Sequence, residues 1–363
     1  MTMKRSAARI AQRRLHTPLS RGAASATGGN IQYCIKTYNA ISAVGLKRFP
    51  TELYQVSPEA DEPFAIMLRS HPLKDEEVGP TVRAIARCGA GTNNVPVARM
   101  TERGIPVFNS PGANANAVKE LSVCALLLAS RGIAQSISAV SDMLEVEEDP
   151  AVIKKRVEAE KKKFGGQEIK GKTLGVIGLG HIGASLAEAA LDLGMNIVAY
   201  DPAISLEAAW RLPGQSIDRV LRLEDLLSQS DYISLHVPYI PDKTHHLLDL
   251  PALQCLKPSC NIINFARGEL IDVDALAGLY ENGDFYGTYV GDFPTKVLAG
   301  NPRCLFLPHL GASTEEAEEN SAAMAADEVR DFLEHGIIRH SVNFPETTLP
   351  RRGEKPCRTE DWT

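Results

Sequence analysis

Three glycines and one aspartate have the spacing of a dinucleotide-binding turn. Gly178, Gly180 and Gly183 follow a short apolar run and precede a stretch with helical character. In such a turn the first glycine permits a tight bend, the second lets the backbone approach a pyrophosphate, and the third lets helix and strand pack closely. Asp201 ends the next apolar run, about 20 residues further on, where a carboxylate bonds the ribose hydroxyls and repels a 2′-phosphate. The pattern predicts a site for NAD rather than NADP.

Arg267 and His309 are the candidates for the chemistry next to that cofactor. Arg267 follows an apolar run, and in open α/β sheets ligands bind at the carboxyl ends of strands. A guanidinium there can hold a carboxylate with two hydrogen bonds, although a surface pair with Glu269 would look the same in sequence. His309 lies before a helical stretch, and an imidazole titrates near neutral pH, so it can take or return a hydroxyl proton. Position alone does not separate it from four other histidines, which are His71, His236, His245 and His246.

The elements that must position these residues alternate along the chain. Apolar runs of strand length are separated by longer helical stretches, which predicts an α/β protein with parallel sheets. The expected strands are 31–36, 64–68, 82–87, 105–108, 173–177, 196–200, 232–236, 262–265, 288–290 and 305–307. The expected helices are an apolar helix over 118–130, a charged, solvent-facing helix over 149–163, a helix ending at 193, and helices over 223–228 and 274–281.

A final helix is expected to begin near Thr314. Ser313 and Glu316 have the spacing of a capping box, in which the serine oxygen accepts a free backbone N–H and the glutamate returns the bond. Gly336 suits the end of this helix, because glycine readily adopts the left-handed conformation that follows many helices. Beyond it, residues 346–363 are predicted to form a disordered tail.

Composition argues against several classes of protein. The 363 residues suffice for two domains of ordinary size. A net charge of −6 argues against a nucleic-acid partner, which favours a basic surface. No run of about 18 apolar residues is present, so no membrane partner is expected. The seven cysteines lack the C-x-x-C spacing of zinc sites, so no metal is expected, and free thiols fit a reducing compartment.

Residues 1–29 differ from the rest of the chain. They contain six lysine or arginine residues among serine and alanine, and the first acidic residue is Glu52. This composition resembles a mitochondrial or plastid transit peptide. The alternative is a disordered basic tail on a cytoplasmic protein.

Taken together, these motifs resemble the D-isomer-specific 2-hydroxyacid dehydrogenase family. The residues that carry the resemblance are 178–183, Asp201, 264–268 and 308–314. Within the family, the stretches 35–39, 90–94, 110–116 and 341–344 are similar to short forms without a C-terminal regulatory domain that act on 3-phosphoglycerate. The resemblance implies two Rossmann-like lobes. An NAD-binding domain over 109–312 is inserted into a substrate domain made of 31–108 and 313–345.

The resemblance also implies roles for individual residues. Arg267 would bind the substrate carboxylate, and His309 would be the acid/base residue. The implied cofactor contacts are Gly178, Gly180, His181, Ile182, Gly183, Asp201, Phe265, Ala266 and Asp292. The implied substrate contacts are Arg69, Ser70, Arg87, Gly91, Thr92, Asn93 and Arg267. Two arginines beside a doubly charged phosphate make electrostatic sense, although each also fits an ordinary surface position.

One position departs from the family pattern. The family has a glutamate a few residues after the position of Asp292, and that glutamate orients the catalytic histidine. Here the run reads Gly291-Asp-Phe-Pro-Thr-Lys-Val297, so Lys296 or Val297 occupies its place. Asp292 is then a candidate to orient His309, and Lys296 is a candidate to join in binding or proton transfer.

The function implied is NAD-dependent oxidation of 3-phosphoglycerate to 3-phosphohydroxypyruvate, which opens serine biosynthesis. One alternative is reduction of hydroxypyruvate or glyoxylate, or action on another D-2-hydroxy acid. A more distant one is an NADH-sensing binding protein that resembles co-repressors of this fold. The family also implies a homodimer or homotetramer, in which the apolar helix over 118–130 packs across a two-fold axis, but a helix buried within one subunit would look the same.

Overall fold

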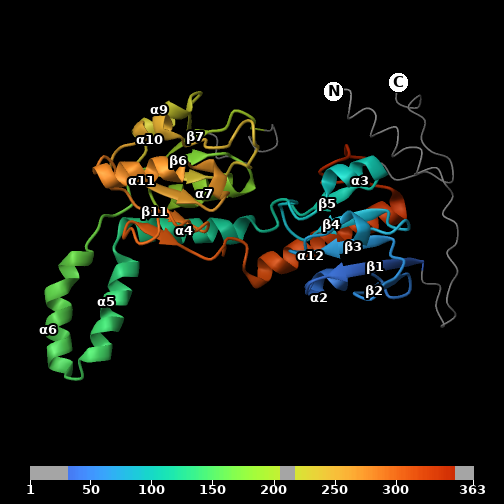
Figure 1. The fold of residues 1–363 in the computed structure, drawn as a ribbon, viewed down its shortest axis with the longest axis horizontal. Helices are drawn as coiled ribbons and strands as arrows, with labels where there is room; N and C mark the ends of the chain where they lie inside the picture. Colours follow the sequence, from blue (N-terminus) through green and yellow to red (C-terminus); the bar gives the residue numbers. More distant parts are fainter. Residues whose placement is uncertain (1–31, 205–216, 348–363) are drawn as a thin grey trace. The chain divides into compact units, whose positions relative to one another are not determined.

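The chain forms two separate α/β units. The computed structural model describes residues 32–204 and 217–347 (Figure 1). The first unit runs to Asn114 and resumes at Thr314, and the second is Ala115–Ser313. The leader expected over 1–29 lies outside the described residues, as does the expected tail beyond Thr347. Thr347 itself pairs with Ile338 in an isolated antiparallel bridge.

The first unit is built on a five-stranded sheet in the order β2-β1-β3-β4-β5. Every strand pair in it is parallel. The strands are β1 (Tyr33–Tyr38), β2 (Tyr54–Ser57), β3 (Ala65–Leu68), β4 (Ala84–Arg87) and β5 (Val107–Asn109). All four residues of β3 are buried, as expected for a central strand of a parallel sheet that is covered on both faces. The short helices of this unit are α2 (Ala43–Leu46) and α3 (Val97–Arg103).

Helix α12 (Glu315–Arg330) returns to this first sheet. Its small residues Ala322, Ala325 and Ala326 lie in one hydrophobic cluster with residues of β1, β3 and β4. The predicted capping box on Ser313 is wrong, because the extended residue before the helix is Thr314, whose hydroxyl accepts the Ala317 N–H at 3.1 Å. The third helical residue from that cap is an alanine, so no glutamate returns the bond. The helical segment ends at Gly336, with φ +70°, after the π-helical turn Asp331–His335, as predicted.

The second unit contains a seven-stranded sheet in the order β12-β11-β10-β9-β6-β7-β8. All of its strand pairs are parallel. The strands are β6 (Thr173–Ile177), β7 (Asn196–Tyr200), β8 (Ile217–Arg219), β9 (Tyr232–Leu235), β10 (Asn261–Asn264), β11 (Tyr289–Gly291) and β12 (Cys304–Phe306). The helices that pack on it are α4 (Ala115–Ser130), α7 (His181–Asp192), α9 (Leu223–Gln229), α10 (Leu250–Gln254) and α11 (Val273–Asn282). The predicted fold class is therefore confirmed.

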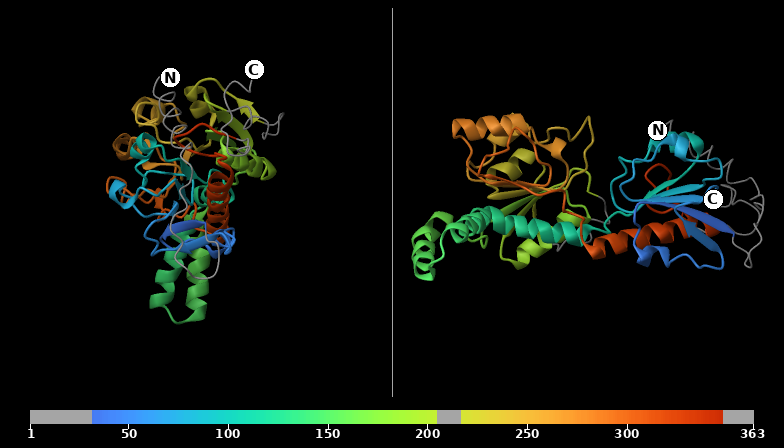
Figure 2. Two further views of the ribbon diagram at one scale, coloured as in Figure 1. Left: turned by 90° about the vertical axis from the view of Figure 1, so that its right-hand side faces the viewer. Right: turned by 60° about the horizontal axis from the view of Figure 1, so that its bottom comes forward.

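A helical hairpin extends from the second unit, away from its sheet (Figures 1 and 2). It consists of α5 (Ile133–Val146) and α6 (Pro150–Glu160). The sequence predicted the second helix but missed the first. Helix α5 buries only Met143 and α6 buries no residue. No single described helix has the length and apolarity needed to cross a membrane, and α4 and α5 reach that threshold only as a pair bent by 70°.

Candidate active site

The Gly-rich turn joins β6 to α7. A different structural feature explains the presence of glycine at each of its three positions. Gly178 has φ +95°, and a Cβ there would lie 2.9 Å from the backbone of His236. A Cβ on Gly183 would lie 2.0 Å from the Gly178 carbonyl oxygen, so helix and turn touch there. A Cβ on Gly180 would meet nothing within 4 Å. The open side of the turn at Gly180 is the cradle that a pyrophosphate needs, and the predicted cofactor fits it.

Asp201 directly follows β7 and holds the same turn. One carboxylate oxygen accepts the Leu179 N–H at 2.8 Å, and the other accepts the Ala203 N–H at 2.9 Å. Each oxygen has a second lone pair available for a ribose hydroxyl. His181 and Ile182 form the first turn of α7, directly after the Gly-rich turn that Asp201 holds. The residues predicted to hold a dinucleotide therefore lie along one edge of the sheet.

The loop after β10 is shaped by Asn264, for which the sequence predicted no role of its own. The Asn264 side chain accepts the Ala266 N–H at 3.1 Å and donates to the Arg267 carbonyl at 2.8 Å. The Arg267 guanidinium, half-buried, donates to the Ala266 carbonyl at 2.6 Å. The Phe265 side chain belongs to the hydrophobic core. A contact from this position to a nicotinamide would be made by its backbone.

Asp292, His309 and Arg267 come together from three adjacent strands. Strand β11 lies between β10 and β12, and Asp292 is the first residue after β11, with 2% of its surface exposed. The Leu307 N–H bonds the Gly291 carbonyl at 2.9 Å, which places the exposed His309 beside the same strand end. The ring of Phe293 packs edge-on against the His309 imidazole at 5.2 Å between centroids.

Burial raises the pKa of the Asp292 carboxyl, and four groups oppose this effect. In order of importance they are the His309 imidazole, the backbone N–H groups of Gly311 and Asp292 itself, and the Arg267 guanidinium. Neither carboxylate oxygen of Asp292 accepts a well-formed hydrogen bond within the described residues. A buried carboxylate that faces cationic groups without being tied to them is unusual, and it marks this edge as a candidate site of proton chemistry.

The two residues at the place of the missing family glutamate lie outside this cluster. Lys296 is exposed, and no ion pair or hydrogen bond of its side chain to His309 or Asp292 is found among residues 217–347. Val297 is 49% exposed. The structure therefore does not bring the predicted catalytic residue Lys296 to His309.

In the first unit, Arg69 and Arg87 lie at the carboxyl ends of neighbouring strands. Leu68 and Arg87 are register partners in β3 and β4, and the Arg87 side chain donates to the Arg69 carbonyl at 3.1 Å. The Arg69 guanidinium lies 2.6 Å from a carboxylate oxygen of Glu318 in the first turn of α12. Gly89 has φ +142°, a backbone conformation that residues with a side chain rarely adopt, so this position favours glycine. Glu318 could not be predicted as a partner of Arg69, because sequence spacing does not link the start of a helix to a strand some 250 residues away.

Two asparagines shape the loops that follow these strands. The Asn39 side chain, with φ +67°, accepts the N–H groups of Ser70 and His71 at 3.0 and 2.8 Å. The Asn94 side chain donates to the carbonyls of Arg69 and His71 at 3.1 and 2.8 Å. Together they fix the backbone of the predicted substrate residues Arg69 and Ser70. The loop with the predicted residues Gly91, Thr92 and Asn93 closes with a turn from the Val95 N–H to the Thr92 carbonyl.

The other histidines do not join the cluster around His309. His71 bonds Glu77 at 2.9 Å in the first unit. His236 bonds the Ser234 hydroxyl at 2.9 Å, and burial lowers its pKa to about 4. His245 and His246 stack on each other, with centroids 4.0 Å apart. No group of three metal-ligating side chains is found among residues 32–204 and 217–347.

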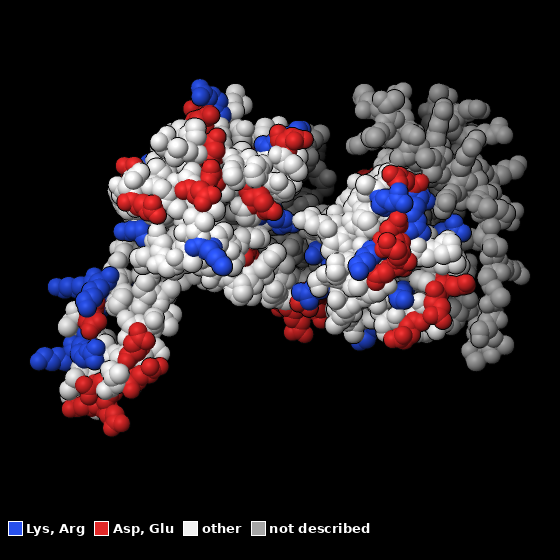
Figure 3. All heavy atoms as spheres, in the orientation of Figure 1, with Lys and Arg blue, Asp and Glu red and all other residues white. Residues whose placement is uncertain are grey.

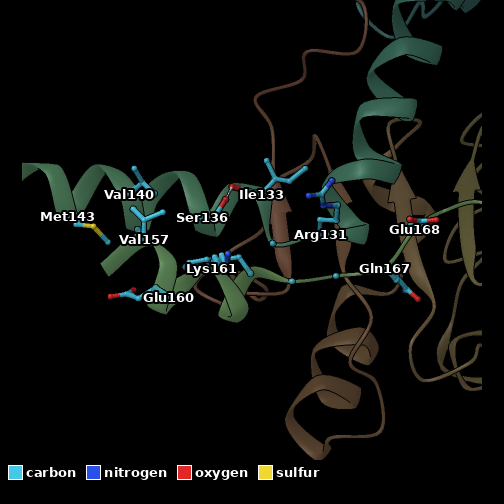
Figure 4. A pocket seen from close by; sticks show the side chains of 15 residues that line it. Arg131, Ile133, Ser136, Val140, Met143, Val157, Glu160, Lys161, Gln167 and Glu168 are labelled. Carbon is cyan, nitrogen blue, oxygen red and sulfur yellow. Dashed lines mark hydrogen bonds between the residues drawn. The ribbon is translucent and has the colours of Figure 1, made fainter. Parts of the chain in front are cut away.

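A separate hollow of about 660 Å³ lies at the root of the helical hairpin (Figure 4). Val140 and Met143 of α5 line it, together with Val157 and Lys161 at the α6 end. None of the predicted site residues lines it, so it is a feature of the hairpin and not of the candidate active site.

Comparison with known proteins connects this arrangement to one family. Residues 134–311 match the model for the D-isomer specific 2-hydroxyacid dehydrogenase, NAD binding domain. The chain is 34% identical over 301 residues to D-3-phosphoglycerate dehydrogenase of Escherichia coli, which covers 79% of this chain and 68% of that protein. It is 35% identical over 305 residues to D-3-phosphoglycerate dehydrogenase of a Synechocystis species, covering 82% of this chain. The chain spans about half the length of that relative, since 51% of it is covered.

Solved structures show the same fold. The cofactor (NAD+)-bound 3-phosphoglycerate dehydrogenase of Entamoeba histolytica matches with a TM-score of 0.65 at 24% identity, covering 86% of this chain and 99% of that one. At this identity the likeness speaks for the fold alone.

Proposed function

The chain belongs to the D-isomer-specific 2-hydroxyacid dehydrogenase family, and we propose from that premise that it oxidises 3-phosphoglycerate to 3-phosphohydroxypyruvate with NAD, the first step of serine biosynthesis. The observation that carries the proposal is the edge of the second sheet. There Arg267, Asp292 and His309 gather at adjacent strand ends, and the Gly-rich turn opens at the same edge. Relatives named for this reaction are 34–35% identical to the chain.

The proposed chemistry uses each of these residues in one role. The Arg267 guanidinium holds the substrate carboxylate and polarises the neighbouring C2 carbon. His309 takes the proton of the C2 hydroxyl as the alcohol becomes a ketone, and returns it in the reverse direction. The nicotinamide of bound NAD supplies the acceptor for the hydrogen on C2. The preference for NAD over NADP rests on the Asp201 carboxylate, which repels a 2′-phosphate.

We assign recognition of the substrate phosphate to the first unit. Arg69 and Arg87 are the cations at the carboxyl edge of its sheet, and planar guanidinium groups match phosphate oxygens well. The loop with Gly91, Thr92 and Asn93 supplies backbone N–H groups beside them. This assignment separates the proposed substrate from unphosphorylated hydroxy acids, which lack the doubly charged group.

A substrate panel with both nicotinamide cofactors tests the proposal. Oxidation is followed at the absorbance of the reduced nicotinamide, with 3-phosphoglycerate, glycerate and other D-2-hydroxy acids, and reduction with hydroxypyruvate and glyoxylate. We expect the highest kcat/KM for 3-phosphoglycerate with NAD. Preferential reduction of glyoxylate or hydroxypyruvate would instead favour a reductase. Tight NADH binding without turnover of any acid would favour a binding protein.

We also propose that the chain forms a homodimer through the hairpin. Ile137, Val140 and Leu144 follow one another at helical spacing on α5, with 66%, 39% and 57% of their surface exposed. Acidic side chains gather at the free end of the hairpin and basic ones lie along α6 (Figure 3). The acidic residues are Asp142, Glu145, Glu147, Glu148 and Asp149, and the basic ones are Lys154, Lys155 and Arg156 on α6 and Lys161, Lys162 and Lys163 just after it. Glu158 and Glu160 lie among the basic residues and pair with Arg156, Lys161 and Lys163. A second copy turned by a two-fold axis would set acid against base, which makes the surface self-complementary.

Light scattering after size-exclusion chromatography tests this association. We expect a dimer for the unmodified chain and a monomer for Leu144→Glu. The matched control is Leu221→Glu, since Leu221 is 95% exposed but lies outside the hairpin. A dimer that survives Leu144→Glu together with Ile137→Glu contradicts the proposal, and a monomeric parent chain contradicts it outright.

For the cellular location we propose an organelle. The support is the run of basic residues without acids over 1–29. A fluorescent protein fused behind residues 1–29 is expected to enter mitochondria or plastids, and a diffuse cytoplasmic signal would contradict the proposal.

A further inference from the structure

The second unit lacks a carboxylate at the position where the family carries one, although its proposed base needs a counter-charge. A histidine that accepts a proton becomes an imidazolium, and a nearby carboxylate stabilises that charge and holds the ring. In this chain Lys296 and Val297 stand at that place, and both are exposed. The question is which group, if any, supplies the negative charge to His309.

The register of the sheet singles out one residue. Gly291 pairs with Asn264 on one side and with Phe306 on the other. Asp292 therefore extends from the middle strand, with the Arg267 loop on one flank and the His309 loop on the other. A Cβ placed on Gly311 would lie 3.5 Å from a carboxylate oxygen of Asp292. The segment of residues 309–311 thus wraps over the buried carboxylate.

Among the groups that lower the pKa of the Asp292 carboxyl, the His309 imidazole has the largest effect, ahead of the backbone N–H groups of Gly311 and Asp292 and of the Arg267 guanidinium. The titratable groups that face it are His309, Arg267 and the phenol of Tyr289. Helix α4 contributes Val118, which packs beside Gly311. Neither carboxylate oxygen has a hydrogen bond of full geometry within the described residues, and only 2% of the residue is exposed. Burying a charge in this way is costly unless a neighbouring cation uses it.

We propose that Asp292 is the positioning residue for His309, replacing the glutamate of the family pattern by supplying its counter-charge from the strand end instead of from the following loop. This inference rests on the proposed function, in which His309 handles the hydroxyl proton. During oxidation the hydroxyl O–H bond breaks, its proton passes to the imidazole, and the hydrogen of C2 leaves with its electron pair to NAD. Asp292 exchanges no proton in this step and stays ionised beneath the imidazolium.

The first test is the pH profile of kcat/KM for 3-phosphoglycerate with NAD. Asp292→Asn keeps the shape of the side chain and removes its charge. We expect the plateau to fall roughly 10²-fold. We also expect the acid limb to move down by about one pH unit, because the imidazolium loses its counter-charge. The matched control is Lys296→Gln, which changes a charge in the same loop, and we expect it to keep the profile of the parent chain.

The second test needs no activity. Thermal unfolding is measured for Asp292→Asn, His309→Gln and the double variant, at about pH 6 and about pH 8.5, on either side of ordinary histidine titration. At the lower pH, Asp292→Asn should raise Tm more in the His309→Gln background than in the parent chain, because only the parent loses an attraction. At the higher pH the two shifts should be equal.

Each outcome decides something. Equal Tm shifts at both pH values, or an unchanged pH profile for Asp292→Asn, would overturn the assignment. A profile that moves with Lys296→Gln but not with Asp292→Asn would overturn it in favour of the loop lysine. If the parent chain oxidises no 2-hydroxy acid, the proposed function fails, while the thermal cycle still shows whether Asp292 and His309 are coupled.

Discussion

The carboxyl edges of the two sheets hold their charged groups in opposite ways. In the first unit, the Arg69 guanidinium forms an ion pair with Glu318, and the Arg87 side chain donates a hydrogen bond to the Arg69 carbonyl. In the second unit, the Asp292 carboxylate is buried without a full hydrogen bond in the described part of the chain, and His309 is exposed beside it. The first edge is suited to binding an anion by exchange of an ion pair. The second is suited to a change of protonation.

Replacing His309 should have the largest effect on kcat/KM. It tests directly whether the edge of the second sheet is the site of proton transfer. We expect His309→Gln to lower kcat/KM by about 10³- to 10⁴-fold, because the hydroxyl proton loses its acceptor. NAD binding, measured by calorimetry, should be unchanged. A variant that keeps more than about a tenth of the activity would show that proton transfer does not depend on this edge.

The next prediction compares two glycine variants of the Gly-rich turn, one expected to weaken NAD binding and the other expected to lower stability. Gly180→Val should weaken NAD binding by about 10²-fold or more, roughly 3 kcal/mol, because its side chain fills the open cradle. Its Tm should stay near that of the parent chain, since a Cβ there meets nothing within 4 Å. Gly183→Ala is the contrasting variant. Its Cβ would lie 2.0 Å from the Gly178 carbonyl oxygen, so we expect a loss of stability of about 1–3 kcal/mol. Equal behaviour of the two variants in both measurements would contradict this division.

A smaller effect, with opposite signs, tests the first edge. We expect Arg69→Ala to raise KM for 3-phosphoglycerate about tenfold, with little change in kcat. Glu318→Gln should lower KM by a few-fold at most, because the phosphate no longer competes with a carboxylate, and exposed ion pairs are weak. Steady-state kinetics with glycerate is the control, since an acid without phosphate should not sense either change. If both variants raise KM alike, the Arg69–Glu318 ion pair stabilises the fold, and the substrate phosphate does not replace the Glu318 carboxylate as the partner of Arg69.

The smallest effect concerns a second buried carboxylate, Glu328 of α12, which does have a partner. His340 lies 2.7 Å from it, while burial and the nearby Asp327 and Asp331 raise its pKa to about 9. The folded protein therefore holds a proton that the unfolded chain releases above its ordinary pKa. Stability from this group is present in acid and is lost as the pH rises toward about 9. The decrease in Tm from about pH 5 to about pH 9 should be about 2–4 °C smaller for Glu328→Gln than for the parent chain. An unchanged slope would show that Glu328 is ionised throughout.

Much of the fold follows from local pattern. Strands β6 and β7 were predicted to the residue, because fully buried parallel strands are continuous apolar runs that end in glycine or aspartate. Strands β2 and β8 were missed, since they are short edge strands with exposed or polar residues. Helix α5 was missed although its apolar residues recur at helical spacing, and in the structure most of them are exposed.

The site was predictable wherever a motif fixes it within a few residues. The roles of Gly178, Gly180 and Gly183 follow from one turn, and the structure gives each glycine the expected surroundings. Contacts between distant segments were not predictable in the same way. The Arg69–Glu318 pair depends on how α12 returns to the first sheet. That Lys296 makes no ion pair or hydrogen bond with His309 in the described part of the chain depends on the path of one loop. Spacing along the chain carries no information on either.

The most direct test of the central claim follows the hydrogen on C2. The chain is incubated with NAD and 3-phosphoglycerate deuterated at C2, and the reduced cofactor is analysed by mass spectrometry. The account predicts one deuterium in the reduced nicotinamide, formed at a rate that falls with His309→Gln. Reduced cofactor without the label, or no reduced cofactor with any 2-hydroxy acid, would contradict it.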